Sequence, residues 1–238
     1  DVVITISHLG YIKRTPLTEF RTQSRGGVGK KASATRDEDF IEHIYVANMH
    51  STMLFFTQNG KCYRLKVYEI PEGTRASKGR PVQNVISIEP GDIIKTYVNA
   101  KSIESEEYCN SHFVLLATRK GIVKKTALSE YSNRRSRNKG INAITVREGD
   151  EHRDAILTTG DSQVLLAARN GRCVRFDEED ARPLGRAASG VRGISLDEDD
   201  EVMSVVCYTP GSGDAASQTA LVVSEHGFGK RTDFEEYR

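Results

Sequence analysis

Short apolar runs separated by polar turns recur along the chain, and five of these runs lead into a turn that ends in glycine. Each run has five or six residues, and a second short run of mixed apolar and basic residues follows the turn. Two strands joined by a tight turn form a β-hairpin, in which glycine supplies the required positive φ angle. The pattern therefore predicts five hairpins, with turn glycines at Gly10, Gly60, Gly121, Gly171 and Gly227.

The hairpins form a repeat, because their turn glycines are 50, 61, 50 and 56 residues apart, the length of one four-stranded propeller blade. A second glycine follows 19 residues after each of the first four: Gly29, Gly79, Gly140 and Gly190. A basic residue follows four residues after all five: Arg14, Arg64, Lys125, Arg175 and Arg231. An acidic residue follows nine residues after all five: Glu19, Glu69, Glu130, Asp180 and Glu236.

A blade cannot bury both of its faces alone, so neighbouring units must stack around a shared core. We therefore predict one all-β domain over residues 1–238, a propeller-like disc of four-stranded antiparallel blades. Its units are 1–50, 51–111, 112–161, 162–217 and a partial fifth unit at 218–238. The second unit is the longest, and its extra polar residues at 101–111 are expected to form a solvated loop insertion.

Composition narrows the class of protein. The 238 residues carry 34 basic and 33 acidic side chains, which excludes a uniformly basic coat and an acidic disordered tail. No apolar run reaches the 18 or so residues of a membrane-spanning helix. The chain begins with Asp1, without Met or a signal sequence, and is expected to be a piece of a larger protein. The four cysteines are scattered, which favours reduced thiols in the cytoplasm.

The charges are segregated along the repeat. The 21 residues after each of the first four turn glycines together hold 23 bases and 8 acids, whereas the remaining residues hold 11 bases and 25 acids. Equivalent segments of a propeller occupy equivalent places on its rim, so the sequence predicts a basic belt suited to a long polyanion. The loops of this belt are rich in glycine and serine, which leaves backbone N–H groups free for phosphate oxygens. Few aromatic residues lie among the bases, which favours duplex over single strands.

A less specific interpretation is that each base four residues after a turn glycine pairs with the acid nine residues after the same glycine. Such surface pairs are common and contribute little. Five acids cannot neutralise 23 bases, so a surplus of positive charge remains under either interpretation. A propeller that binds another protein through its rim or flat face is a further alternative.

The first of these loops contains a recognisable motif. Residues 23–30 read QSRGGVGK, which resembles the box Q-R-R-G-G-[RK]-G found in the C-terminal domain of the DNA gyrase A protein. Ser24 and Val28 depart from the box, since each replaces a base. The segments KVYEIPEGTRASKGRP, GIVKKTALSEY, GVRGI and GFGKRT are similar to the same family, and the resemblance covers essentially the whole chain.

The resemblance implies a β-pinwheel of six four-stranded blades that exchange strands, with duplex DNA wrapped around the basic rim in a positive sense. It also implies that the domain is part of an ATP-hydrolysing type II topoisomerase that introduces negative supercoils. The implied location is the bacterial cytoplasm, at the nucleoid. The partners it implies are sequence-independent duplex DNA, the rest of the gyrase A protein and the gyrase B protein, with no membrane. The catalytic tyrosine and the ATPase belong to other parts of such an enzyme. The corresponding domain of topoisomerase IV has a more degraded box, so the box favours gyrase.

Enzyme motifs are not found. The segment GGVGKKAS fails as a phosphate-binding P-loop, because Ser24 and Lys31 replace its first glycine and its Mg²⁺-binding hydroxyl. The six histidines show no metal-ligand spacing and are expected to be solvated or in turns, and no acidic cluster has the EF-hand pattern. We therefore predict no catalytic residue, metal or cofactor in this chain.

The predicted DNA-binding residues are the five repeated bases, the box and the basic loop residues. They are Arg14, Gln23, Arg25, Gly26, Gly27, Gly29, Lys30, Lys31, Arg64, Arg75, Lys78, Arg80, Lys125, Arg134, Arg135, Arg137, Lys139, Arg175, Arg186, Arg192 and Arg231.

Overall fold

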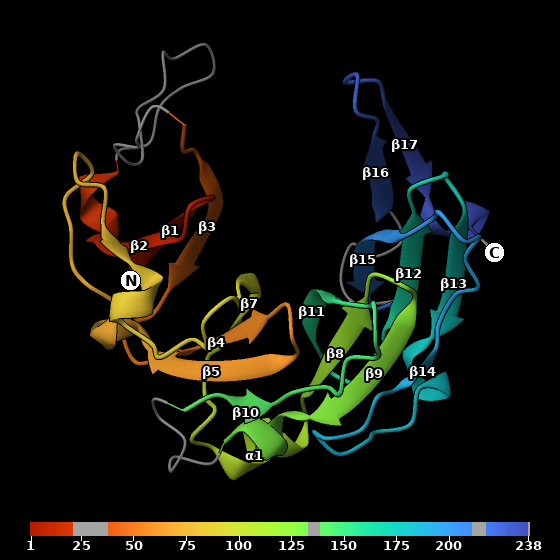
Figure 1. Cartoon of the computed structure of the whole chain (residues 1–238), viewed down its shortest axis with the longest axis horizontal. Helices are drawn as coiled ribbons and strands as arrows, with labels where there is room; N and C mark the ends of the chain where they lie inside the picture. Colours follow the sequence, from red (N-terminus) through yellow and green to blue (C-terminus); the bar gives the residue numbers. More distant parts are fainter. Residues whose placement is uncertain (21–37, 133–138, 211–217, 238) are drawn as a thin grey trace.

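The chain folds into an arc of small antiparallel β-sheets, shown in Figure 1. The computed structural model describes residues 1–20, 38–132, 139–210 and 218–237. The described part contains three four-stranded sheets, one three-stranded sheet and one two-stranded sheet. The prediction of four-stranded antiparallel blades is therefore confirmed, while the total of six blades stays a prediction.

Each sheet is built around one of the predicted hairpins. The first has the order β3 (Ile41–Ala47), β1 (Val2–Ser7), β2 (Tyr11–Pro16), β6 (Arg80–Pro81). The second has the order β7 (Ile94–Ala100), β4 (Thr52–Thr57), β5 (Lys61–Lys66), β10 (Ile141–Asn142). The third has the order β11 (His152–Thr158), β8 (Phe113–Thr118), β9 (Ile122–Ala127), β14 (Val191–Arg192). The fourth has β15 (Val202–Tyr208), β12 (Gln163–Ala168), β13 (Cys173–Asp177), and the fifth pairs β16 (Thr219–Val223) with β17 (Gly229–Asp233).

Short helices fill the connections. A 3-10 turn follows the second strand of each hairpin: η1 (Leu17–Glu19), η2 (Val67–Glu69), η4 (Leu128–Tyr131), η6 (Glu178–Asp180) and η8 (Phe234–Glu236). A further 3-10 turn, η3 (Val82–Asn84), follows β6, and α1 (Glu106–Asn110) is the α-helix of the described residues. No helix in this part of the chain is long and apolar enough to cross a membrane.

Neighbouring blades exchange strands. β6, β10 and β14 each come from one unit of the repeat but complete the sheet of the unit before it. Figure 1 shows β10 and β14 on the outer side of the arc and β7, β11 and β15 on the inner side. This exchange is the pinwheel arrangement that the family resemblance implies.

The repeated glycines have two different roles. The five turn glycines all have φ between 82° and 88°, as the hairpin prediction requires. The glycines 19 residues later give room for the exchanged strand: a Cβ on Gly79 would lie 2.6 Å from the carbonyl oxygen of Ile12, and one on Gly190 would lie 2.4 Å from that of Val123. The second glycine of the repeat therefore marks where each outer strand meets the preceding blade.

The cores lie between blades. Ile4 and Ile6 of the first blade share a buried cluster with Phe55 of the second. Leu116 of the third blade is in a cluster with Leu54 of the second, and further clusters join the third blade to the fourth and the fourth to the fifth. Each blade thus depends on its neighbours for burial, as stacking predicts.

Two expectations need correction. The insertion at 101–111 is more than a solvated loop, because Ile103 and Cys109 are buried in the core between the second and third blades and α1 packs against η4. His152 is also buried rather than solvated, and Thr96 Oγ1 lies 2.8 Å from its Nε2. His8 and His226 do lie exposed in turns, and all four cysteines are free.

Candidate nucleic-acid interface

The repeated bases four residues after each turn glycine do not all face outward. Arg64 and Lys125 are buried, and the side chains of Arg14 and Arg175 are only 15% and 21% exposed. Arg231, in β17, is exposed. The expectation that this position forms part of an exposed belt is therefore wrong for the first four units.

These four side chains instead bind the next turn along the arc. Arg14 Nε donates to the carbonyl oxygen of Ile70 at 2.8 Å, and Lys125 Nζ donates to that of Glu178 at 2.9 Å. Arg64 donates to the carbonyl of Ser132 at 2.6 Å, and Arg175 to that of Phe234 at 3.0 Å. Each acceptor belongs to the following unit, so this position joins consecutive blades.

The acids that pair with these four bases are not the acids nine residues after the turn glycines. Arg14 pairs with Glu72 at 2.8 Å and Arg64 with Glu104 at 2.6 Å. Lys125 lies 3.9 Å from Glu178, and Arg175 lies 3.4 Å from Glu235. None of these carboxylates is nine residues after a turn glycine, so the alternative interpretation, pairing of the two repeated charges within one blade, is wrong for these four bases.

Two of the acids nine residues after the turn glycines contact a basic loop instead. Glu19 accepts from the backbone N–H of Arg75 at 3.2 Å, and Glu130 lies 3.5 Å from the guanidinium of Arg186. Both acceptors belong to the unit before the loop. These contacts help to orient the loops that carry the remaining bases.

A second group of bases lies on the segments that lead into or form β6, β10 and β14. These strands lie on the outer side of the arc, and we call this group the loop bases. Arg75 and Arg186 are half-buried, and the others are exposed. Among the described residues, none of the exposed ones pairs with a carboxylate, since every ion pair there involves other side chains. The loop bases are Arg75, Lys78, Arg80, Lys139, Arg182, Arg186 and Arg192.

Ten predicted residues lie outside the described part of the chain. They are Gln23, Arg25, Gly26, Gly27, Gly29, Lys30, Lys31, Arg134, Arg135 and Arg137. Their contact with DNA stays a prediction.

A shallow cavity of about 590 Å³ lies between β10 and the loop of the fourth unit that carries Arg186. Glu130, Asn142 and Arg186 contribute its polar lining, and Ile141 and Ala187 its apolar lining. The outer edge is therefore hollowed where the third and fourth units meet, beside a half-exposed guanidinium.

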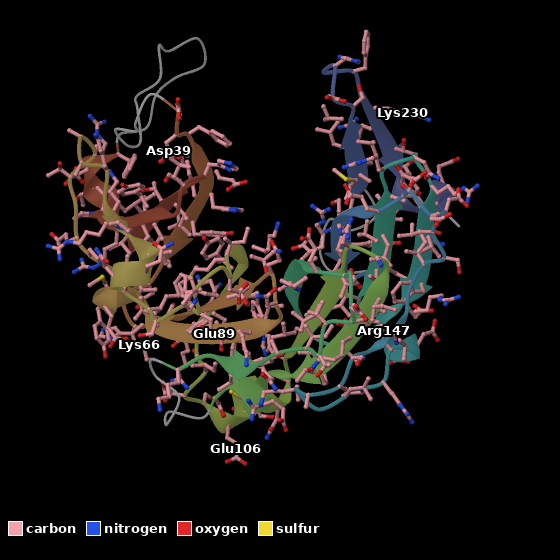
Figure 2. All side chains as sticks on the ribbon, in the orientation of Figure 1. Asp39, Lys66, Glu89, Glu106, Arg147 and Lys230 are labelled. Carbon is pink, nitrogen blue, oxygen red and sulfur yellow. The ribbon has the colours of Figure 1, made fainter. Side chains whose placement is uncertain are left out.

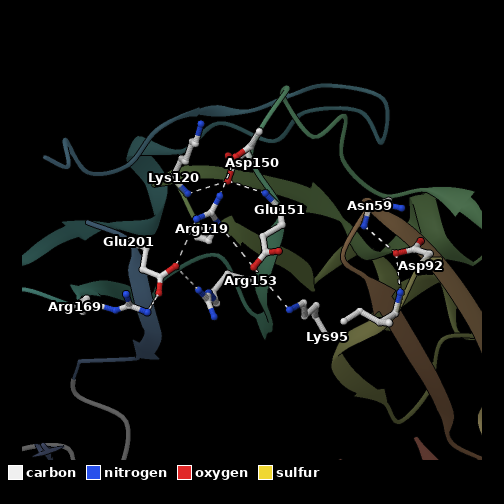
Figure 3. A network of polar contacts seen from close by, with 12 residues as sticks. Asn59, Asp92, Lys95, Arg119, Lys120, Asp150, Glu151, Arg153, Arg169 and Glu201 are labelled. Carbon is white, nitrogen blue, oxygen red and sulfur yellow. Dashed lines mark hydrogen bonds and ion pairs between the residues drawn. The ribbon is translucent and has the colours of Figure 1, made fainter. Parts of the chain in front are cut away.

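Several bases near β7, β11 and β15 share acidic partners in one network, as Figure 3 shows. Glu201 accepts from Arg153 at 2.9 Å and from Arg169, and Arg119 lies 3.8 Å away. Lys95 and Arg119 also lie within 4 Å of Glu151. Within the described ranges, Arg119, Arg153 and Arg169 thus share acidic partners, whereas the exposed loop bases have none. Figure 2 draws the side chains of the described residues on the ribbon.

Sequence reasoning missed one base and one repeated acid. Arg182 is exposed next to Pro183, which bridges Lys125 of the preceding blade. A repeated aspartate accepts from the backbone N–H just before each of the first four turn glycines, as Asp150 does from Lys120 at 2.9 Å. Three of these aspartates follow their turn glycine by 29 residues, a spacing that the sequence already contains. They are Asp39, Asp92, Asp150 and Asp200.

Comparison with known proteins identifies relatives along the whole chain. A family model described as "DNA gyrase C-terminal domain, beta-propeller" matches residues 1–48, 51–96, 112–158, 162–208 and 218–238. The DNA gyrase A protein of Salmonella typhimurium is 44% identical over 237 residues, and that of Staphylococcus aureus strain MRSA252 is 44% identical over 238 residues. Both alignments cover 100% of this chain but 26% of the relative.

Solved structures agree on the fold. The C-terminal domain of a DNA topoisomerase IV superimposes with a TM-score of 0.77 at 27% identity, covering 100% of this chain and 68% of that one. A DNA gyrase A C-terminal domain superimposes with a TM-score of 0.76 at 24% identity, covering 99% and 72%.

Strand exchange between four-stranded blades and a basic outer edge define a propeller domain of the β-pinwheel class. The chain belongs to the DNA gyrase C-terminal domain family, as its sequence motifs predict. It spans about a quarter of the length of the curated relatives that it matches.

Proposed function

We propose that the outer edge of this arc binds duplex DNA through its phosphates, without reading the base sequence. The observation that carries the proposal is the row of exposed loop bases, which have no carboxylate partner in the described part of the chain and lie on the same side of successive blades. Backbone phosphates are spaced regularly along a duplex, so a repeated row of cations matches them whatever the sequence.

The absence of a reading element supports sequence-independent binding. Helices that read the major groove present several side chains to base edges over two or more turns. Within the described ranges, α1 has five residues and the other helices are 3-10 turns of three or four. The loops can contact phosphates, but no helix in these ranges is long enough to read the major groove.

The curvature of the arc supports bending of the bound duplex. A straight duplex can touch only part of a curved row of cations, and bending it by a large angle costs several kcal/mol by elastic estimates. Contacts at successive blades offset that cost, so the bound DNA follows the outer edge. By family resemblance, we extend this to a positive wrap that supports negative supercoiling by gyrase, together with the rest of the gyrase A protein and the gyrase B protein.

Salt dependence tests the proposal directly. If about 8 to 11 of the bases contact phosphates, the slope of log affinity against log salt is on the order of −7 to −10. Binding of unrelated duplexes of equal length is measured by filter binding or fluorescence anisotropy at several salt concentrations. A slope near zero, or binding of one sequence alone, contradicts the proposal and favours a propeller that binds protein.

The sense of the wrap needs a separate experiment on the box. Replacing Arg25, Lys30 and Lys31 with alanine removes three bases and keeps those of the other basic loops, so affinity should fall only modestly. We expect the wrap to be lost, because the box belongs to the first blade, where the resemblance places the closing of the DNA turn. Nicked circles are ligated with the full-length protein bound, and their linking number is measured. An unchanged shift in linking number contradicts the closing role of the box.

A further inference from the structure

Two lysines are buried at the same position of the repeat. Lys13 and Lys124 are each the third residue after a turn glycine, and each is 1% exposed. They lie in β2 and β9, the outer strands of the first and third hairpins. A buried ammonium group needs hydrogen-bond acceptors for its three protons.

Five of their six acceptors are carbonyl groups of the basic loop in the following unit. Lys13 Nζ donates to the carbonyl oxygens of Thr74 at 2.7 Å, Arg75 at 3.2 Å and Ser77 at 2.9 Å. Each ammonium proton thus has an acceptor, and all three acceptors lie within four consecutive residues.

Lys124 makes the equivalent contacts between the third and fourth units. Its Nζ donates to the carbonyls of Gly185 at 3.0 Å and Arg186 at 2.8 Å, and to that of Ala143. Gly185 and Arg186 hold the same places in the fourth unit as Thr74 and Arg75 hold in the second. The two clamps are therefore the same device used twice.

Each clamp fixes a loop that carries bases. The two loops are tight turns, closed by hydrogen bonds from Ser77 N–H to Thr74 and from Ala188 N–H to Gly185. Because the carbonyls of each turn point to the buried ammonium, the turn is held against the preceding blade. Loop bases then extend from a fixed backbone: Arg75, Lys78 and Arg80 in one case, Arg182, Arg186 and Arg192 in the other.

The fold itself does not require lysine here. The same position holds Tyr63 in the second unit and Val174 in the fourth, within the same kind of hairpin. Tyr63 packs against Gly140, where a Cβ would lie 2.7 Å from its ring. Burial also disfavours the charge, because desolvation lowers the pKa of Lys13 and lowers the pKa of Lys124 to about 8. Burying a lysine here is unfavourable, and the second and fourth units form the hairpin without one. The role of the lysine therefore lies in the loop that it holds.

We propose that Lys13 and Lys124 are positioning residues that hold the basic loops of the second and fourth units in the geometry that binds phosphates, without touching DNA themselves. This inference rests on the proposed function. It adds that affinity for DNA depends on two charges that are hidden from DNA.

The test uses Lys13→Met and Lys124→Met in the full chain. Methionine fills most of the same volume but cannot donate a hydrogen bond. We expect each variant to lose the contacts of up to three loop bases, so the magnitude of the salt slope falls by up to about 2.7. The control is Lys120→Met, which removes one exposed charge that clamps no loop and changes the slope by at most about 0.9.

Trypsin cleavage without DNA gives a readout that is independent of the proposed function. Lys13→Met should speed cleavage after Arg75 but not after Arg186, and Lys124→Met should do the reverse, so each variant is the other's control. Should both Met variants fail to fold, Lys13→Gln and Lys124→Gln, which keep two N–H donors, replace them in the same comparison.

The outcomes separate the two ideas. Faster local cleavage with a reduced slope supports the positioning role. Unchanged cleavage overturns the positioning role. Faster cleavage also overturns it, and leaves a structural role only, if the magnitude of the salt slope falls no further than in Lys120→Met. A parent protein that binds DNA with no salt dependence overturns the proposed function instead, whatever the cleavage pattern.

Discussion

Arg14 Nε donates to the carbonyl oxygen of Ile70 at 2.8 Å, and this contact joins the first blade to the turn that ends the hairpin of the second. The same position in the next three units makes the same kind of contact. A repeat of bases that the sequence offers for DNA thus serves in these units to connect blades. The distinction leads to opposite expectations for two groups of bases.

Removal of a connecting base should lower stability but not the number of phosphate contacts. In Arg64→Met, the carbonyl of Ser132 and the carboxylate of Glu104 lose a charged donor, which costs about 1–3 kcal/mol of unfolding free energy. Since Arg64 is buried, the salt slope of DNA binding should remain that of the parent. Denaturant unfolding and a salt titration measure the two quantities. The matched control is Lys66→Met, which loses an ion pair with the same Glu104 from a side chain that is 18% exposed. A lower slope in Arg64→Met would place this side chain on DNA.

Removal of loop bases should have the opposite effect. Arg182→Ala with Arg192→Ala removes two exposed charges, so the magnitude of the slope should fall by about 1.8 while the unfolding midpoint stays within error. The corresponding control is Arg153→Ala with Arg169→Ala, which removes two bases already paired with Glu201. Equal slopes for the two double variants would mean that the outer edge is not the DNA surface.

The basic loop of the third unit offers a larger test of whether the loop bases contact DNA. Replacing Arg134, Arg135, Arg137 and Lys139 with alanine should reduce the slope by up to about 3.6, because each phosphate contact contributes about 0.9. If the quadruple variant binds as tightly as the parent with the same slope, this loop does not face DNA.

The sequence predicts the hairpins well, because their turn glycines are a local requirement that leaves a local signal. Gly171 needs only a positive φ, and its spacing from the other turn glycines gives the blade length. The direction of a basic side chain is not local in this way. Arg14 and Arg80 have the same chemistry, yet Arg14 turns inward because the strand exchange brings the carbonyl of Ile70 within reach. Burial at the insertion follows the same rule, since Ile103 and Cys109 find their core in the next blade.

Acid should destabilise the domain through His152. Burial lowers the pKa of His152 to about 3, below the ordinary value of 6.5, and the positive charge of Lys95 acts in the same direction. The unfolded chain therefore binds a proton between pH 6.5 and 3 that the folded chain does not, so unfolding free energy falls as pH drops through this window. In His152→Gln this contribution should vanish, and the stability of the variant relative to the parent should rise from about pH 7 to about pH 4. A constant difference over that range would show that His152 is not buried as a neutral ring.

The close approach of exchanged strands can be separated from the strain of positive φ by comparing Gly190→Ala with Gly171→Ala. Both glycines have a positive φ, 91° and 88°, so both variants incur the strain of a left-handed backbone, about 1–3 kcal/mol. At Gly171 a new Cβ has no heavy atom within 4 Å, so strain is the whole effect. At Gly190 the Cβ would lie 2.4 Å from the carbonyl oxygen of Val123, and the backbone must move to relieve the clash.

That movement acts on the outer edge, because Val191 and Arg192 directly follow Gly190 and pair with β9. We expect Gly190→Ala to lose about 1–3 kcal/mol more unfolding free energy than Gly171→Ala, the usual cost of overpacking. It should also reduce the magnitude of the salt slope by about 0.9, since Arg192 is displaced with its strand, whereas Gly171→Ala should leave the slope unchanged. Denaturant unfolding and salt titration of the pair measure both effects. Equal losses of stability would mean that the exchanged strand of the fourth unit does not pack closely on the third blade.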